Sequence, residues 1–475
     1  MNKMQFAKTL LLLIIICTLC AGCSEPYRPT GPNGPADPDY LPDDGSVPVS
    51  STTIENTPII YIQTENDARI PENKTEIRCT VRLVSKNASE CAEGLEATIR
   101  CRGNGSMTVG AETGKYPYKL KFDNKINVFN LGNTKEKDWV LLANVGEHTM
   151  LRNYAAKLMG NMLDGIPYSC HSKLVNVYLN GDYVGVYELT EQVEVKPGRV
   201  NINDSLKIDE NGFLVELDYY ADRGDDKDAI FEVNGSDFTV QSKIRNDKQL
   251  AYIRQCIASL DDAIHADDPE HLAEIADINS IVDMYILQEF AKNIDVGFSS
   301  FYLYKDVGGK IFFAPPWDFD LAFGNDERLD NGSYEELYVA TGRPDLKQSS
   351  KWYIKLFSYD WFRTLVAQRW EYVSEYIVPS VIDSVRRAAD DIAGDMEYNY
   401  QRWPFLGGRQ HLEPDAIADL TTYEEHVVYL LTWMENRKAW LDVEFAEYLT
   451  TDVPDPDGSE IPDGSEIPDD FDLQP

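Results

Sequence analysis

The chain has 475 residues, of which 80 are acidic and 44 are basic, so its formal net charge is −36. This excess of acid excludes a nucleic-acid binder, which needs Lys and Arg to neutralise phosphates, and it disfavours docking through a polybasic surface onto anionic lipid. With 43% hydrophobic and 11% aromatic residues, the composition is that of a globular protein.

Residues 1–23 have the pattern of an export signal. Two lysines precede the apolar run Leu10–Leu19, which is short for a membrane span, and two small residues stand before Cys23. This ending is typical of a bacterial lipoprotein signal, except that Cys20 stands where such signals have an aliphatic residue. We therefore expect Cys23 to be the lipidated N-terminus of an exported protein of the bacterial cell envelope, at the outer membrane or cell surface. A plain secretory signal and an uncleaved anchor are the alternatives.

Two acidic segments flank the expected domain. Residues 24–56 are rich in Pro, Gly and Asp and carry a charge of −5, which predicts a stiff, solvated tether. Residues 451–475 carry −9 and repeat the sequence GSEIPD, which predicts a disordered tail. Because the first 23 residues carry +2, the remaining −24 belongs to the expected folded domain, residues 57–450.

The expected domain begins with strands and ends with helices. Alternating β-branched and aromatic residues predict strands at Ile59–Gln63, Glu76–Val84, Glu96–Arg102, Tyr116–Phe122, Leu174–Leu179, Tyr183–Leu189, Gly212–Asp218, Ser300–Lys305 and Lys310–Ala314. Helical spacing predicts helices at 149–163, Asp247–Ala266, His271–Ala276 and Asn279–Asn293 and over much of 350–449. This order indicates an α+β fold in which residues 57–450 form one unit of two lobes.

Five cysteines lie outside the signal: Cys79, Cys91, Cys101, Cys170 and Cys256. An odd number leaves at least one of them without an intramolecular partner. The first three are close in sequence, and this proximity predicts one disulfide among them. The six histidines have no metal-ligand spacing, so we do not expect a zinc site.

The densest group of chemistry-bearing residues lies at 292–324. Asp295 stands where a predicted helix turns toward a strand, and Asp318 and Asp320 follow a Pro-Pro-Trp corner. At a spacing of two in an extended segment, both carboxylates project from one face, where they repel each other unless a divalent cation such as Mg²⁺ lies between them. Turn capping is the alternative for a lone Asp. The apolar residues around this pair favour buried carboxylates that need partners.

A second group lies at 98–122. The Arg102-Gly-Asn104-Gly turn between two predicted strands brings backbone N–H groups close to where an anion can bind. Lys115, Lys119 and Lys121 follow, the last two on one face of a predicted strand. A solvated strand face is the ordinary environment of such lysines, but in so acidic a domain they are candidates for holding phosphate.

Three further charged positions are of interest. Glu188 and Glu191, in the motif YVGVYELTEQ, are expected to pair with one of the lysines of the second group. Arg152 is either a charge on a helix surface or a buried organiser.

Six motifs follow one another over about residues 98–325. They are IRCRGNGS, YPYKLKF, WVLLAN with LRN, VYLNGDYVGVYELTEQ, KNIDVGFSSFYLYKD and FFAPPWDFDLAFG. In this order they resemble the spore-coat protein CotH family of atypical, secreted protein kinases. The resemblance implies a reduced, two-lobed, protein-kinase-like fold. It also implies that the chain binds ATP with Mg²⁺ or Mn²⁺ and transfers a phosphoryl group to Ser or Thr of a protein.

The resemblance also implies roles for single residues. Asp295 matches the catalytic Asp, which orients the acceptor hydroxyl and takes its proton. Asp318 matches the metal-binding Asp, with Asp320 as a second acid. Glu191 matches the acid that orients a phosphate-binding lysine, and either Lys119 or Lys121 is that lysine.

The remaining implied positions complete the nucleotide site. Arg102 and Asn104 are expected to contact the nucleotide, and Trp317 to wall the adenine pocket. Ser300 stands five residues after Asp295, where kinases have a metal-binding Asn, and is a poorer ligand. A non-catalytic surface-binding or adhesion lipoprotein is therefore the alternative hypothesis. A hydrolase with paired carboxylates fits less well, because glycosidases need the pair across a sugar cleft.

Overall fold

The computed structural model describes residues 57–449 except 133, 222–228, 344, 347, 349, 410 and 411. All of these belong to one compact unit, Ser46–Pro475. The predicted signal, the tether, Cys23 and the tail lie outside the described residues. Within them the α+β prediction is confirmed, since strands dominate the first part and helices the last part.

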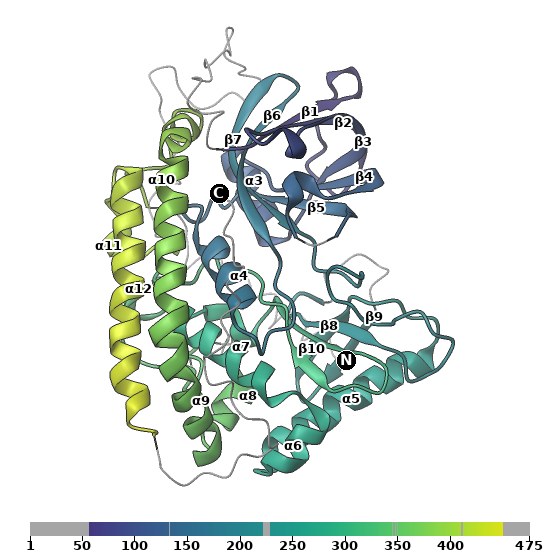
Figure 1. Ribbon diagram of the computed structural model, residues 1–475, viewed down its shortest axis with the longest axis vertical. Coiled ribbons are helices and arrows are strands. Elements are labelled where there is room, and N and C mark those ends of the chain that lie inside the picture. Colours follow the sequence, from purple (N-terminus) through teal and green to yellow (C-terminus); the bar gives the residue numbers. More distant parts are fainter. Residues whose placement is uncertain are drawn as a thin grey trace, which may run out of the picture. The chain divides into compact units, whose positions relative to one another are not determined.

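Seven strands close into a barrel (Figure 1). They are β1 (Ile59–Thr64), β2 (Ile77–Val84), β3 (Ala92–Cys101), β4 (Tyr118–Ile126), β5 (Glu136–Leu142), β6 (Ser172–Leu179) and β7 (Asp182–Glu191). The barrel order is β1-β2-β3-β4-β5-β7-β6, and β1 pairs in parallel with β6 to close it. Alternate side chains such as Val81, Leu120 and Trp139 fill its interior. The sequence predicted six of these strands but neither β5 nor the closure.

A five-stranded antiparallel sheet follows the barrel in the chain. Its order is β12-β11-β8-β10-β9. The strands are β8 (Phe213–Leu217), β9 (Ala229–Val233), β10 (Ser236–Val240), β11 (Phe301–Lys305) and β12 (Ile311–Phe313). Helix α5 (Asp247–His265) packs on β9, and α7 (Ile278–Ala291) packs on β12. Because nearly every residue of α7 is buried, this helix is a rigid core element, and it leads directly into the turn that carries Asp295.

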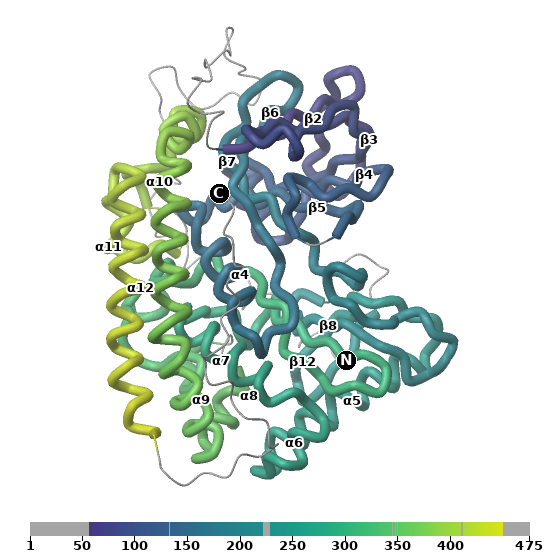
Figure 2. The backbone as a smooth tube through the Cα atoms, in the orientation of Figure 1, coloured from purple at the N-terminus to yellow at the C-terminus, as the bar shows by residue number. Residues whose placement is uncertain are grey.

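The remaining helices are α3 (Gly105–Thr113), α4 (Arg152–Met162), α6 (Pro269–Ile275), α8 (Lys351–Leu356), α9 (Asp360–Tyr372), α10 (Val378–Arg402), α11 (Asp415–Ala418) and α12 (Tyr423–Ala446). Helices α10 and α12 run side by side, and α4 packs between β6 and α7 (Figure 2). A capping box formed by Thr422 and Glu425 starts α12. In the described part of the chain, none of the helices has the length and apolar character needed to cross a membrane.

Helix α10 is joined to the barrel at β7. The side-chain oxygen of Asn399 accepts hydrogen bonds from Lys115 Nζ (3.1 Å) and Val186 N (3.1 Å). Gly185 permits this close approach, because a Cβ there would lie 2.6 Å from the Asn399 oxygen. Burial lowers the pKa of Lys115 to about 7. Lys115 therefore helps to join α10 to the barrel.

The five described cysteines are all free thiols, so the predicted disulfide is wrong. Cys79 lies on β2 opposite Ala97 of β3, and Cys101 ends β3, so both occupy barrel-facing positions set by strand register. Cys91 is exposed and accepts a hydrogen bond from Ser85 N. Closeness in sequence thus did not bring these thiols together.

Candidate active site

Asp295 lies in a short 3-10 turn, Ile294–Gly297, directly after α7. Lys292 adopts a left-handed conformation (φ 47°) that ends the helix, and the side chain of Asn293 accepts a hydrogen bond from Asp295 N (3.2 Å). The turn leads straight into β11. The predicted position of Asp295, between a helix and a strand, is confirmed.

Asp318 lies beside the end of this turn. The hydroxyl of Ser300 donates to Asp318 Oδ2 over 3.0 Å. Both residues have a positive φ, 60° for Ser300 and 68° for Asp318, so both are held in left-handed turns. The expectation of an extended segment at Asp318 and Asp320 is therefore wrong: the chain bends at Asp318, and this bend brings the residue to the Asp295 turn.

The three aspartates form an acidic cluster of mutually repelling groups. Burial, and after it the charge of Asp318, raises the pKa of Asp295 to about 7. The pKa of Asp320 is raised well above its usual range by burial and then by Asp318 and Asp295. Two cations face the cluster: Arg328 acts on Asp295, and Arg102 acts on Asp318.

Replacing Asp295 with asparagine is expected to stabilise the protein. The pKa of Asp295 is about 7 in the folded state, against 3.8 ordinarily, so the folded state binds more protons than the unfolded state between those values. The free energy of unfolding therefore falls as pH rises through this window, and the full penalty applies above pH 7. We expect Asp295→Asn to raise it by roughly 2–4 kcal/mol at pH 8 and by less at pH 5.

Denaturant unfolding at both pH values checks this expectation. Asp262→Asn, on the exposed face of α5, is the matched control and should change little at either pH. An equal gain at pH 5 and pH 8 would contradict the proposed electrostatic origin.

Arg102 presents hydrogen-bond donors near this cluster. Its guanidinium lies 5.7 Å from the centre of the Trp317 ring. Burial lowers its pKa, whereas the nearby Asp318 raises it. No hydrogen bond from this guanidinium to another described residue is found. An anion is the natural partner for such a group.

The glycine turn after Arg102 is the start of a helix. Gly103 has φ 90°, and a Cβ there would lie 2.0 Å from Ser106 Oγ, so the turn requires glycine. The exposed Asn104 follows, and the nine-residue helix α3 begins at Gly105. The first backbone N–H groups of α3 therefore lie close in sequence to Arg102, an arrangement suited to phosphate.

A buried lysine–glutamate pair lies behind Trp317. Lys157 Nζ of α4 is 2.7 Å from Glu188 Oε1 of β7, and both side chains are at most 2% exposed. The side chain of Asn144 donates to the other Glu188 oxygen over 3.0 Å. Lys157 Nζ also lies 5.0 Å from the centre of the Trp317 ring. Because only 7% of Trp317 is exposed, it offers little surface to adenine. Its ring lies near the side chains of both cations, Arg102 and Lys157.

A chain of hydrogen bonds connects this pair to the acidic loop. Asn153 Nδ2 donates to Asn144 Oδ1 over 3.4 Å, and Asn153 Oδ1 accepts from Phe319 N over 2.8 Å. Phe319 directly follows Asp318. The Lys157–Glu188 pair therefore holds the Asp318 segment through Trp317 on one side and through Phe319 on the other.

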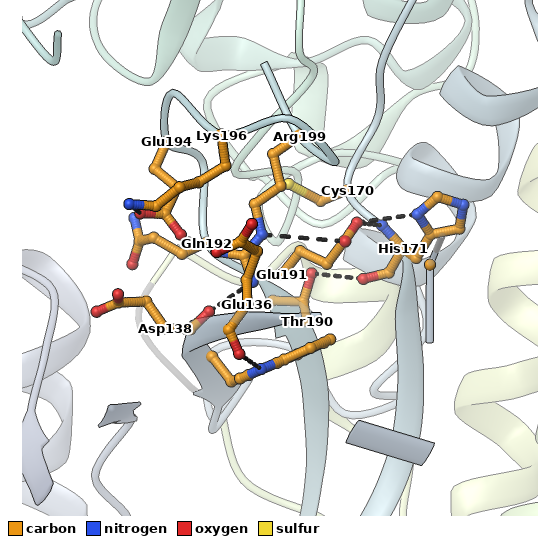
Figure 3. Close-up of polar contacts among 12 residues, drawn as sticks. Glu136, Asp138, Cys170, His171, Thr190, Glu191, Gln192, Glu194, Lys196 and Arg199 are labelled. Atoms are coloured by element: carbon orange, nitrogen blue, oxygen red, sulfur yellow. Dashed lines mark hydrogen bonds and ion pairs between the residues drawn. The ribbon is translucent and has the colours of Figure 1, made fainter. Parts of the chain in front are cut away.

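The predicted pairing of Glu191 with Lys119 or Lys121 is not found. Glu191 Oε2 accepts hydrogen bonds from the backbone N and from Nδ1 of His171, both over 2.9 Å, and Arg199 lies 4.0 Å from Oε1 (Figure 3). Lys119 pairs with Asp138 (2.9 Å). The lysines flank barrel-facing Leu120, so strand alternation turns them outward.

Two alternatives were open for Arg152, a charge on a helix surface or a buried organising residue. The structure shows the second, because Arg152 is buried. Its Nε donates to the carbonyl of Ala322 over 3.1 Å, and its Nη1 is 2.9 Å from Glu147 Oε2. Arg152 thereby ties the start of α4 to the segment that follows Asp320. It supports the acidic cluster from behind.

The acidic cluster fits a divalent cation that is held partly by the protein. Among the described residues, no three His, Cys, Asp or Glu side chains form a complete metal-binding group. Mg²⁺ is commonly bound by one or two carboxylates, with phosphate and water oxygens completing its shell. Asp318 and Asp320 supply two such carboxylates. Asn325, which donates to the Asp320 carbonyl (2.8 Å), keeps a buried side-chain oxygen with no hydrogen-bond partner in the described part.

A family model described as CotH kinase protein matches residues 99–441, well over half of the chain. No curated protein matches the chain. The matched span includes all the site residues described above.

Proposed function

The chain belongs to the CotH kinase protein family, and on that premise we propose that it is an atypical protein kinase that uses ATP and a divalent cation to phosphorylate Ser or Thr of a protein. The observation that carries this proposal is the convergence of Asp295, Asp318 and Arg102. A carboxylate with a pKa of about 7, a carboxylate pair and a guanidinium whose donors bond to none of the described residues are three parts that phosphoryl transfer needs.

Asp295 is the proposed general base. Its pKa of about 7 suits a group that must accept a proton near neutral pH. Asp295 takes the proton of the acceptor hydroxyl while the acceptor oxygen bonds to the γ-phosphorus and the bond to the departing ADP oxygen breaks. The Asn293 hydrogen bond and the rigid α7 hold Asp295 in place for this transfer.

The other residues bind and orient. Asp318 and Asp320 would hold Mg²⁺ or Mn²⁺, and Ser300 orients Asp318 through their hydrogen bond. A cation held there would neutralise negative charge on the phosphates of bound ATP. Arg102 and the start of α3 donate hydrogen bonds to phosphate oxygens. Lys157 acts through Trp317 as a positioning residue.

The order of the barrel and the helices also supports a proposal about the fold. The β-barrel and the helical part would correspond to the two lobes of a reduced kinase-like fold, with the Lys157–Glu188 pair near their joint.

Export and lipid anchoring are further proposals from the sequence. Cys23 would carry the lipid, and residues 24–56 would hold the kinase domain away from the membrane. Cells expressing the full chain should incorporate a labelled fatty acid into it, and a Cys23→Ala variant should not. Equal labelling of both would contradict lipidation at Cys23.

Nucleotide binding tests the kinase proposal. The full-length chain should melt at a higher temperature with ATP and Mg²⁺ or Mn²⁺ than with either alone, and it should transfer labelled phosphate to protein acceptors. Absence of both effects would favour the alternative, a surface-binding lipoprotein that keeps the fold without catalysis.

A further inference from the structure

A groove with a volume of about 850 Å³ runs along the first half of α12. Its lining includes Glu424, Val428, Thr432 and Asn436, which recur every four residues and therefore share one face of the helix. The opposite wall is the segment 330–334. We call this pocket the α12 groove.

The two walls of the α12 groove are tied to each other. Trp433 Nε1 donates to the carbonyl of Gly332 over 2.8 Å, and Arg437 Nη1 donates to the carbonyl of Tyr334 over 2.7 Å. Both donors belong to α12 and both acceptors to the opposite wall. The groove is therefore preformed, and a ligand does not have to order either wall.

The charges of the α12 groove favour a cationic ligand. Among the described residues, its lining holds the acids Asp330, Glu424 and Glu425 and no Lys, Arg or His. Arg343, which is not a lining residue, pairs with Asp330 over 2.8 Å, and Glu425 accepts a hydrogen bond from a backbone N–H at the start of α12. The exposed Glu424 carboxylate has no hydrogen-bond or ion-pair partner in the described part of the chain. Glu424 is thus open to a cationic side chain of a ligand.

The shape and the apolar surface of the groove favour an extended peptide. Val428 is 56% exposed, and Tyr334 and Tyr429 are partly exposed. From Glu424 to Asn436 the helix is about 18 Å long, which is the length of an extended peptide of about five residues. Such a peptide can place a Lys or Arg at Glu424 and an aliphatic side chain at Val428, whereas a small cation would meet only part of this surface.

The α12 groove adjoins the segment that follows the acidic cluster. The hydroxyl of Tyr429 donates to the carbonyl of Gly324 over 2.9 Å, and Gly324 stands four residues after Asp320. The groove lining includes neither Asp295 nor Asp318, so a segment bound in it leaves the site of transfer open. A protein acceptor is long enough to occupy both places, and a chain of net charge −36 attracts basic segments.

We propose that the α12 groove binds an extended segment of the acceptor protein in which a Lys or Arg stands beside an aliphatic side chain. Glu424 contacts the cation, and Val428 contacts the aliphatic side chain. The segment is separate from the Ser or Thr that is phosphorylated, so the groove lowers the KM of the acceptor and leaves kcat unchanged. This proposal rests on the proposed kinase function.

Fluorescence anisotropy of labelled peptides on the full-length chain tests the groove. The probe has the core Arg-Arg-Leu-Leu, and two matched peptides have Glu-Glu-Leu-Leu or Arg-Arg-Gln-Gln. The probe should bind at least about fivefold more tightly than either matched peptide. Glu424→Lys and Val428→Ser should each weaken its binding about fivefold or more.

Two variants control for net charge and for loss of an exposed valine. Glu397→Lys, at an exposed position of α10, changes the net charge as Glu424→Lys does. Val443→Ser removes an α12 valine that is 71% exposed and does not line the groove. Both controls should bind the probe as the unchanged chain does, and thermal melting shows that each variant folds.

Phosphorylation assigns the groove to the acceptor. Ser peptides joined to the Arg-Arg-Leu-Leu core by Gly-rich linkers of about 5 to 20 residues are compared with the same series on Arg-Arg-Gln-Gln. At one linker length, the Leu series should have a KM about fivefold lower with an equal kcat. Glu424→Lys should remove this difference.

Equal binding of the three peptides, or equal weakening in Glu424→Lys and Glu397→Lys, would overturn the proposal, because attraction by net charge would then account for the result. Tight binding of the probe with equal KM in both series would also overturn it. These outcomes leave the kinase function intact. If no peptide is phosphorylated and ATP with Mg²⁺ does not stabilise the chain, the kinase function itself fails, and the anisotropy alone decides whether the groove binds such a segment.

Discussion

Asp318→Asn is expected to abolish the stabilisation of the chain by ATP with Mg²⁺ and to lower phosphoryl transfer about a hundredfold or more. Asn has nearly the size of Asp and also tolerates the left-handed backbone that Asp318 adopts at φ 68°. The Ser300 hydroxyl still finds an acceptor in the amide oxygen. The variant therefore removes one charge from the acidic cluster and little else, and the effect on the cation site is direct.

Two further variants distinguish loss of the cation site at Asp318 from changes at the neighbouring residues Asp295 and Ser300. Asp295→Asn removes the proposed base and should lower transfer by about 10²–10⁴-fold while ATP with Mg²⁺ still stabilises the chain. Ser300→Asn supplies the amide that other kinases have there, at a φ of 60° that Asn accepts, and should preserve nucleotide binding. Thermal melting without nucleotide shows that each variant folds. Unchanged metal-dependent stabilisation in Asp318→Asn would remove Asp318 from the proposed cation site.

Local sequence patterns predicted most elements of the fold but not their closure. Alternation placed β2, β4 and the β6–β7 hairpin within a few residues of their observed bounds, because each strand shows one apolar face. The parallel pairing of β1 with β6 joins segments far apart in the sequence, and no local pattern encodes it. Helix α3 was missed because its residues, GSMTVGAET, have weak helical propensity.

The structural surroundings of the acidic residues were predicted better than those of the basic residues. Asp295 and Asp318 stand in turns next to apolar segments, and the Pro-Pro-Trp corner marked one of these turns in the sequence. The resemblance implied that Glu191 pairs with Lys119 or Lys121, but both lysines face outward from the barrel and Glu191 pairs with His171 instead. The sequence did carry a signal for the buried Lys157–Glu188 pair. Glu188 interrupts an apolar strand, and a buried acid there needs a cation.

Lys157→Met is expected to lower the free energy of unfolding by about 3–5 kcal/mol, because it leaves Glu188 charged and buried without its cation. Combining it with Glu188→Gln removes both charges, and an amide at position 188 can still accept the hydrogen bond from Asn144. Most of the lost stability should therefore return in the double variant. Denaturant unfolding of the single and double variants measures both effects.

In the double variant, phosphoryl transfer should stay low although stability returns. This result would distinguish a role of Lys157 in positioning the acidic loop from a role in folding alone. Lys157 contacts the Trp317 ring, which precedes Asp318, so a chain without Lys157 loses one of the two supports of the acidic loop even when no charge is left unpaired. Lys438→Met, which breaks a partly exposed pair with Asp442 on α12, is the control and should cost about 0.5 kcal/mol or less. Full recovery of kcat in the double variant would show that Lys157 has only a structural role.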